Sequence, residues 1–420
     1  METRIQQWRT GTGVRVLFVE RRALPTVDIR LTFNAGSCRD GAMPGLARMT
    51  SNLLLEGTDH RDAGYISQQL EQHGARASTR CSRDTAELNV RSLSHDAHLK
   101  PVIAELGECI SGSTFPAAAL ERIRQRMLAG LAQQDTAPME MVEKAFTAAI
   151  FAHHPYATSP GGEPASLQSI DPDALRLFHR RYYVAANATL AVVGDLSRQE
   201  AERIAEQLVA QLPSGEPATA LPLARACPAP CVVRIPLDAE QTHVSIGQPS
   251  PPQGHEDHSA LHLGCHILGG AGLTSLLARR MRVERGLSYS SASRLTAGAA
   301  GGRFQMKTHV RNDALAEALA VLRESLQELL ECGPEADALA LARENLLGSL
   351  PLQHASNQDL IGHVSTVGFY DLPMDHIHHF TEQLKALDAQ GVRDAMQRHL
   401  DPASMTTVTV GPESAINAVR

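Results

Sequence analysis

Three histidines, His258, His262 and His266, recur at every fourth position of a stretch that predicts a helix, with Asp257 and Cys265 beside them. Histidines four residues apart lie on one helix face, so their imidazole nitrogens can bind one metal ion together. Histidines on a helix also form hydrogen bonds in a core or an interface, and we favour that structural role for this group.

A second group of polar residues lies on a short helix predicted after Gly45 and before Gly57, where apolar residues recur at helical spacing. Arg48, Ser51 and Asn52 are expected to share one patch of this helix. An arginine cannot lose its proton to bind a cation, and serine and asparagine are poor zinc ligands. We therefore expect no metal ion at this patch.

The third group is a pair, Arg282 and Tyr289, which follows a glycine-rich turn. The pattern predicts a helix from Thr274 to Glu284 that ends at Gly286, and then a strand from Ser288 to Leu295. Arg282 is thus expected at the end of the helix and Tyr289 at the start of the strand. The turn lacks the Lys-Ser/Thr ending of a phosphate-binding loop, so we expect no phosphate there.

Two structural roles are open for this pair. Arg282 could cap the C-terminus of its helix or form an ion pair with Glu284 or Glu56, and Tyr289 could be a core residue. Alternatively, both side chains could donate hydrogen bonds at a functional site.

The composition is that of an ordinary globular protein. The chain has 420 residues, of which 43% are hydrophobic and 20% charged, and its formal net charge is −7. Such a length suggests about two to four domains. No apolar run approaches the roughly 20 residues of a membrane span, and no block of Lys and Arg suggests nucleic acid. We expect neither a membrane span nor a nucleic-acid partner.

Seven cysteines are scattered without a C-x-x-C pair, and we expect structural thiols rather than disulfides or a zinc cluster. They are Cys38, Cys81, Cys109, Cys227, Cys231, Cys265 and Cys332. The N-terminal residues include no apolar segment of a secretory signal. We therefore expect a cytoplasmic protein by default, or a periplasmic one if a signal peptide has been removed.

Strands and helices alternate within both halves of the chain, which predicts an α+β fold. Residues 213–230 are rich in proline and lack periodicity, so they predict a linker between domains at 1–212 and 231–420. The halves are related, because Asp171–Gly194 aligns without a gap with Asp388–Gly411 and matches at seven of 24 positions. We expect two similar domains in tandem.

Several motifs follow one another in a fixed order: Ala35-Gly36-Ser37, Gly45-Leu-Ala to Glu56-Gly57-Thr58, His154-Pro155-Tyr156, Tyr182-Tyr183 to Gly194-Asp195, and Gly269 to Tyr289. Together they resemble the pitrilysin/insulinase family of zinc metallopeptidases, which includes mitochondrial processing peptidase and the core proteins of the cytochrome bc complex. The resemblance implies two homologous α/β-sandwich domains, which form half of a clamshell around a chamber for unfolded peptides.

The chain departs from this family at the metal site. Active members carry His-x-x-Glu-His on the helix where this chain has Arg48, Ser51 and Asn52. A third ligand, a glutamate, would fall between Arg126 and Gln134, a run without an acidic residue. The resemblance therefore implies that this chain binds no zinc and does not hydrolyse peptides alone, and that zinc belongs to a partner subunit.

By contrast, Arg282 and Tyr289 match an arginine and a tyrosine that reach toward a zinc site in another domain of the family. A guanidinium and a phenol both donate hydrogen bonds to the oxygen on which negative charge grows during peptide hydrolysis. The leading hypothesis is a zinc-free subunit that pairs with a homologous subunit carrying the intact His-x-x-Glu-His motif. A narrower version of this hypothesis is a role in peptide-cofactor maturation, as in the two-chain processing factors of pyrroloquinoline quinone biosynthesis.

Unfolded peptide would then add as a strand to the segment Ala75, Arg76, Ala77, Ser78 and Thr79, within a strand expected around 75–85. The alternative is a non-catalytic scaffold like the core proteins. When isolated, the chain could also form a homodimer through the exposed partner surface.

Overall fold

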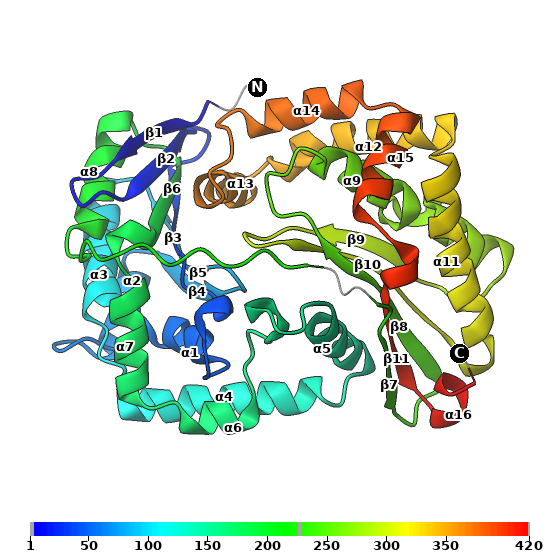
Figure 1. Cartoon of the computed structure of the whole chain (residues 1–420). Helices are drawn as coiled ribbons and strands as arrows, with labels where there is room; N and C mark the ends of the chain where they lie inside the picture. The colour runs from blue at the N-terminus through cyan, green and yellow to red at the C-terminus, as the bar shows by residue number, and fades with distance from the viewer. Residues whose placement is uncertain (1–3, 226–228, 419–420) are drawn as a thin grey trace. The chain divides into compact units, whose positions relative to one another are not determined.

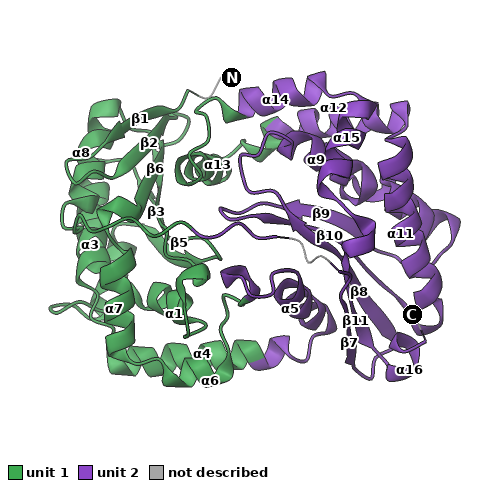
Figure 2. Cartoon of the chain, in the orientation of Figure 1, with its two compact units in different colours: residues 1–131, 158–220, 351–376 green, residues 132–157, 221–350, 377–420 purple. Residues whose placement is uncertain are grey.

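The computed structural model describes residues 4–225 and 229–418, which belong to two compact units. Unit 1 contains residues 1–131, 158–220 and 351–376, and unit 2 contains residues 132–157, 221–350 and 377–420 (Figure 2). Each unit has one β-sheet with helices packed on both of its faces (Figure 1). The predicted α+β chain with two similar α/β-sandwich domains is confirmed.

The sheet of unit 1 has the strand order β1-β2-β6-β3-β5-β4, in which only the β2–β6 pair is parallel. Its strands are β1 (Gln6–Arg9), β2 (Arg15–Glu20), β3 (Thr26–Phe33), β4 (Arg76–Cys81), β5 (Ala86–Leu93) and β6 (Ala188–Gly194). Successive side chains of a strand point to opposite faces. In β2, Val16 and Phe18 therefore enter one hydrophobic core, and Leu17 and Val19 enter another.

Helices cover both faces of this sheet because its central strands are apolar on both sides. The main core lies under α1 (Leu46–Leu53), α2 (Ala63–Gln72), α3 (Asp96–Gly112), α4 (Ala117–Gln134), α6 (Pro164–Ser169), α7 (Pro172–Tyr182) and α8 (Arg198–Val209). The second face is covered by α13 (Asn357–Phe369), whose Leu360, Ile361 and Val364 pack with Leu17 and Val19.

The sheet of unit 2 has the order β7-β11-β8-β10-β9. Its strands are β7 (Val232–Pro236), β8 (Gln241–Ser250), β9 (Ser291–Thr296), β10 (Gly302–Arg311) and β11 (Thr406–Gly411). Its helices are α5 (Pro138–Ile150), α9 (His258–Cys265), α10 (Leu276–Ala278), α11 (Leu315–Cys332), α12 (Ala336–Gln353), α14 (His376–Ala386), α15 (Ala389–His399) and α16 (Glu413–Ile416). The last residues of α12 and the first residue of α14 are assigned to unit 1.

Each unit contains one helix from the other half of the sequence. Helix α13 packs on β6, β3 and β2 of unit 1, and α5 packs on β8 and β11 of unit 2 (Figure 2). The predicted division into two contiguous domains, 1–212 and 231–420, does not account for this exchange of helices. Helix α13 covers an apolar second face of the unit 1 sheet, whereas α5 meets the second face of the unit 2 sheet partly through polar contacts from Glu143 to Arg303 and Gln305.

The repeat seen in the sequence occupies equivalent places in the two sheets. Asp171 caps α7 through Ala174 N at 2.8 Å, and Asp388 caps α15 through Gly391 N at 2.7 Å. Strand β6 then runs parallel to β2 and antiparallel to β3, as β11 runs parallel to β7 and antiparallel to β8. By the same order, the edge strand β4 corresponds to the edge strand β9.

Three predicted element boundaries were wrong. Helix α1 ends at Leu53 rather than near Glu56, because its chain tightens into a turn in which Leu54 N donates to Ser51 O at 3.3 Å. Strand β4 ends at Cys81, and a turn links it to β5. The third error concerns the stretch that follows the glycine-rich turn.

There the α-helix spans only Leu276–Ala278 and continues as a π-helical turn over Arg279–Glu284. Gly286 follows it with a φ of 61°, which fits the predicted helix end. The next strand begins at Ser291 rather than Ser288. Tyr289 therefore lies in a loop before the strand.

The described part of the linker, 213–225 and 229–230, has no helix or strand, and its beginning is hydrogen-bonded to unit 1. Ala185 N donates to Pro213 O at 2.8 Å, and Arg181 Nη1 donates to Glu216 O at 3.0 Å. Six cysteines are free thiols in the structure, whereas Cys227 and the linker residues 226–228 lie outside the described residues.

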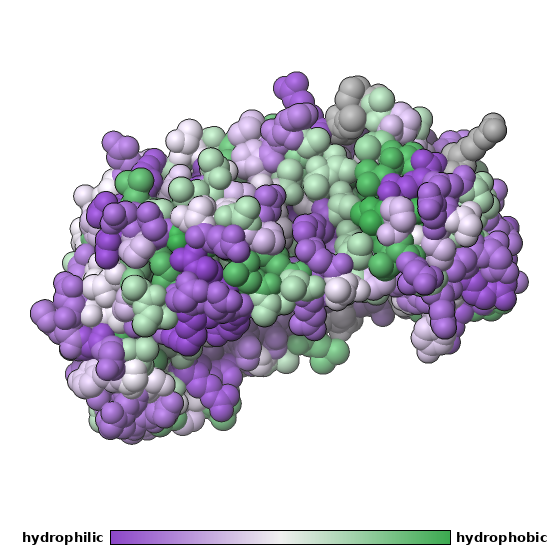
Figure 3. All heavy atoms as spheres, turned by 90° about the horizontal axis from the view of Figure 1, so that it is seen from below, coloured by the Kyte–Doolittle hydropathy of each residue, from purple (hydrophilic) through white to green (hydrophobic). Residues whose placement is uncertain are grey.

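Among the described residues, no helix combines the length and the apolar character that crossing a membrane requires. On the face drawn in Figure 3, hydrophilic residues are interspersed with smaller hydrophobic areas.

Candidate functional site

Helix α1 is fixed at its N-terminus by a buried carboxylate. Asp40 accepts hydrogen bonds from Gly45 N at 2.8 Å and from Ala47 N at 2.7 Å. Gly45 has a φ of 97°, and a Cβ at this position would lie 2.7 Å from Leu167 Cδ2, so another residue would be both strained and crowded. The motif glycine thus serves the close packing of α1 in unit 1.

The pH dependence of folding should report on Asp40. Burial raises the pKa of Asp40 to about 7, although the bonds from Ala47 N and Gly45 N act to lower it. Since an unfolded Asp has a pKa of about 3.9, the native state binds the proton more tightly. This contribution to stability is complete below about pH 4 and is lost as the pH rises to about 7.

We therefore expect the unfolding free energy of the wild-type protein to fall with pH in this window, by up to about 1.4 kcal/mol per pH unit, relative to Asp40→Asn. Urea unfolding at several pH values measures this difference. Asp59→Asn, at an exposed residue, is the matched control and should keep the wild-type slope. Parallel curves for wild type and Asp40→Asn would contradict the prediction.

The three polar residues of α1 keep their helical spacing but differ in exposure. Arg48 is exposed and Asn52 is half-buried, whereas Ser51 is only 1% exposed. Ser51 lies beside the hydroxyl of Tyr183, and burial raises the pKa of that phenol. One of the three positions therefore belongs to the core of unit 1.

The residues of this region do not fit a zinc ion. Cys81 lies close enough to Arg48, Asp40 and Cys38 for these groups to affect its pKa. Burial raises the pKa of both thiols, that of Cys38 to about 12. Both oxygens of Asp40 already accept backbone hydrogen bonds. Within the described residues, no group of three His, Cys, Asp or Glu side chains converges here.

The structure brings Arg282 and Tyr289 together. The guanidinium carbon of Arg282 lies 4.1 Å from the centre of the Tyr289 ring, which is within the range of a cation–π contact. Tyr289 is 76% exposed, and Arg282 is half-buried. Neither side chain has an ion pair or hydrogen bond to another described residue. Both polar ends are therefore available to a molecule outside unit 2's own core.

The structural roles considered from the sequence do not apply to this pair. Glu284 is paired with Arg279 at 3.4 Å, and Glu56 is paired with Arg122. With an exposed fraction of 76%, Tyr289 is not a core residue.

The loop that presents Tyr289 is anchored just before it. Leu287 N donates to Met281 O at 2.7 Å, and both side chains are buried. The hydroxyl of Ser288 lies 2.8 Å from His309 O and 2.9 Å from Ser290 O. These contacts hold the backbone and leave the Tyr289 ring outside. The positioning role of Ser288 was missed from the sequence, because only the fold brings His309 beside it.

The three histidines of α9 and the following turn do not form a metal site. The rings of His258 and His262 are 6.4 Å apart, and His262 packs against Phe380. Burial lowers the pKa of His262 to about 4, with His258 and His266 adding to the effect. His266 Nε2 lies 3.1 Å from Asn345 Oδ1. These contacts are those of packing histidines.

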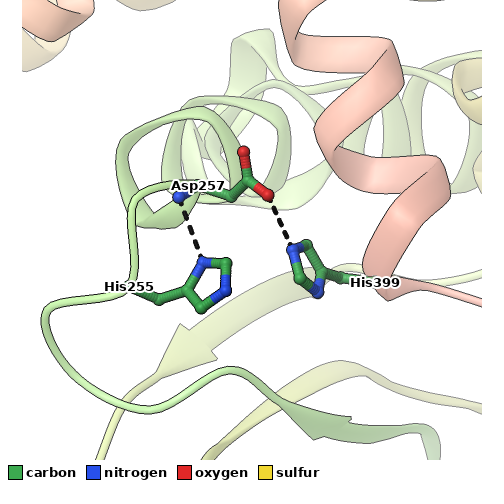
Figure 4. A group of neighbouring side chains, drawn as sticks. All are labelled: His255, Asp257 and His399. Carbon is green, nitrogen blue, oxygen red and sulfur yellow. Dashed lines mark hydrogen bonds and ion pairs between the residues drawn. The ribbon is translucent and has the colours of Figure 1, made fainter.

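Within the described residues, one group of three possible metal ligands does converge: His255, Asp257 and His399 in unit 2 (Figure 4). Asp257 Oδ2 lies 2.8 Å from His399 Nε2, and Asp257 N donates to His255 Nδ1 at 3.1 Å. Arg398 also holds both carboxylate oxygens, at 2.6 and 3.1 Å, and lowers the pKa of Asp257. The group therefore joins the start of α9 to the end of α15, with its carboxylate already neutralised.

The predicted peptide-binding segment forms the edge strand β4 and the residue before it. Ala75 is buried, Ala77 and Thr79 are half-buried, and Arg76 and Ser78 are exposed. One side of β4 pairs with β5, and no described strand pairs with the other side. Its outer backbone groups are thus free of sheet hydrogen bonds.

Comparisons with family models support the same conclusions about the fold. A model described as "Insulinase (Peptidase family M16)" matches residues 15–162. A model described as "Peptidase M16 inactive domain" matches residues 169–346.

Similar proteins include a "non-peptidase homolog" of Helicobacter pylori, 25% identical over 94% of this chain and 91% of its own. An "uncharacterized zinc protease" of Mycobacterium bovis is also 25% identical, over 96% of this chain and 92% of its own.

Among solved structures, a "peptidase M16 inactive domain" from Pseudomonas fluorescens superposes with a TM-score of 0.93 and 35% identity, covering 97% of this chain and 98% of that one. A "protease from Helicobacter pylori" has a TM-score of 0.88 at 18% identity, covering 98% of this chain and 100% of that one, and shows likeness of fold alone.

Proposed function

Since the chain belongs to the insulinase family of peptidases, M16, but carries Arg48, Ser51 and Asn52 on α1, we propose that it is the non-zinc-binding subunit of a two-chain zinc metallopeptidase. Its partner is a homologous subunit with an intact His-x-x-Glu-His motif, which supplies the zinc ion and the general base. This chain supplies part of the chamber wall and two hydrogen-bond donors.

The observation that carries this proposal is the exposed stack of Arg282 on Tyr289. The cation–π contact holds the two side chains side by side at the surface of unit 2. The phenol O–H and the guanidinium N–H groups are the donors that a developing oxyanion needs. The contact favours one arrangement of the two donors before the substrate binds, which reduces the reorganisation that their action requires.

Peptide binding uses the open edge of β4. An extended peptide pairs with the outer backbone groups of Ala75–Thr79, and its side chains alternate between the two faces of the sheet. Unfolded chains suit this mode, because backbone hydrogen bonds do not depend on sequence.

A non-catalytic scaffold is the second candidate, and the printed descriptions of relatives as a "non-peptidase homolog" and an "inactive domain" favour it. The two candidates differ in what Arg282 and Tyr289 do. In a scaffold, these side chains affect neither substrate nor rate.

The double variant Arg282→Ala, Tyr289→Phe separates the two functions. Assembly with the partner is measured by co-purification, and peptide cleavage is measured on the purified complex. We expect assembly to persist and cleavage to fall. Unchanged cleavage by a fully assembled complex would exclude the proposed role and leave the scaffold.

A further inference from the structure

One face of the unit 1 sheet is strongly basic at the edge strand. Arg76, Ser78 and Arg80 of β4 are exposed on the same face, because alternate residues of a strand point the same way. They lie directly opposite Arg91, Asn89 and Glu87 of β5, which in turn lie opposite Asp28, Arg30 and Thr32 of β3.

The arginines of this face differ in their partners. Arg91 is bound by both oxygens of Asp28, at 2.9 and 3.1 Å. Arg30 Nε donates to Asn89 Oδ1 at 2.6 Å and lies 3.8 Å from Glu87 Oε2. These two guanidinium groups are therefore held within the sheet.

Arg76 and Arg80 have no ion pair or hydrogen bond with any other described residue. Arg76 is moreover opposite Arg91, and like charges at directly opposite positions of two strands destabilise the sheet. Asp28 compensates the charge of Arg91, whereas no described carboxylate pairs with Arg76, so an anion could bind there. The two unpaired arginines thus form an incomplete electrostatic arrangement that a negatively charged ligand would complete.

The residues of this face on β3, β4 and β5 line a cavity of about 500 Å³, whose wall is completed by Gln358 and Ile361 of α13. The lining holds four arginines and two carboxylates, Asp28 and Glu87, which leaves two positive charges in a chain whose net charge is −7. Guanidinium groups bind carboxylates in a planar, two-bonded geometry. A concave basic face beside an open sheet edge suits an extended ligand with carboxylate side chains.

We infer that β4 selects extended peptides with acidic side chains, which Arg76 and Arg80 bind on the cavity side of the sheet. This inference rests on the proposed function, because it takes β4 as the strand to which peptide adds. The two arginines are four residues apart, or roughly 13 Å along a strand. An added peptide therefore presents acidic residues to both when they too are four positions apart, with Ser78 between them.

The test is the binding of fluorescent peptides to the full chain, measured by anisotropy. Three peptides share one extended sequence and carry Glu, Gln or Lys at two positions four residues apart. We expect the Glu peptide to bind about tenfold or more tightly than the Gln peptide, and the Lys peptide to bind most weakly. Added salt should weaken the Glu peptide most.

The variant Arg76→Gln, Arg80→Gln should abolish the preference for Glu, so that the Glu and Gln peptides bind this variant with equal affinity. Arg180→Gln, an exposed and unpaired arginine of α7, is the matched control and should leave the preference intact. Circular dichroism melting of each variant verifies that it is folded.

Equal binding of the three peptides would overturn the inference and leave the proposed function standing. If none of them binds, both the charge preference and peptide binding at β4 are refuted. A single-stranded oligonucleotide that binds as tightly as the Glu peptide, and loses affinity in the double variant, would overturn the assignment to peptides.

Discussion

Replacing Tyr289 with phenylalanine should lower kcat for peptide cleavage by the assembled two-chain enzyme by about tenfold to a hundredfold. The substitution removes one hydroxyl and keeps the ring, so the stack with Arg282 persists. The loss is therefore that of a single hydrogen bond to the oxyanion in the transition state. Because such a donor acts mainly in the transition state, KM should change little.

Discontinuous or continuous cleavage assays over a range of peptide concentrations separate kcat from KM. Tyr65→Phe is the matched control, since Tyr65 is also exposed, at 44%, but lies on α2 of unit 1. It should keep the wild-type kcat. A rise in KM at constant kcat for Tyr289→Phe would show a role in substrate binding only, and no change in either would remove Tyr289 from the reaction.

The second large effect is expected on stability, at the helix that unit 2 takes from the N-terminal half. The Glu143 carboxylate of α5 pairs with Arg303 of β10 and accepts a hydrogen bond from Gln305 Nε2 at 2.9 Å. Burial acts to raise the pKa of Glu143, but Arg303 and Gln305 hold it below its usual value. The side chain of Arg303 is only 14% exposed, so Glu143 compensates a largely buried positive charge.

Glu143→Ala should therefore lower the free energy of unfolding of unit 2 by about 2–3 kcal/mol, because it leaves a largely buried guanidinium with only Thr147 to accept its hydrogen bond. Urea unfolding measures the change. Glu140→Ala, at an exposed residue of the same helix, should have an effect within about 0.5 kcal/mol. Equal stability of Glu143→Ala and wild type would contradict the place of α5 in unit 2.

The sequence was a good guide to the repeat and to the altered α1, because both depend on local pattern. A capping Asp before each helix and a glycine at the end of each strand recur in Asp171–Gly194 and Asp388–Gly411. The missing zinc ligands could likewise be recognised at three positions. Neither inference requires knowledge of which distant segments meet.

The exchange of α5 and α13 could not be predicted, since it depends on which sheet faces remain uncovered after the local helices have packed. The exposure of Tyr289 was missed for a related reason. Apolar and β-forming residues favoured a strand from Ser288. In the structure, the hydrogen bond from the Ser288 hydroxyl to His309 O holds the backbone in a loop until Ser291. Contacts between residues far apart in the sequence decided both cases.

The same limit applies to the metal-ligand patterns. Helical spacing brought His258, His262 and His266 to attention, whereas the group that converges, His255, Asp257 and His399, joins residues far apart in the chain. Spacing alone could not reveal it, nor could it reveal that Arg398 already neutralises the carboxylate.

The most direct test of the proposed function is zinc content and peptide cleavage measured on this chain, on its His-x-x-Glu-His homologue, and on their mixture. We predict about one zinc ion per homologous subunit, none bound tightly by this chain, and cleavage that requires both. One tightly bound zinc ion per molecule of this chain, cleavage by this chain alone, or equally fast cleavage by the homologue alone would contradict the account.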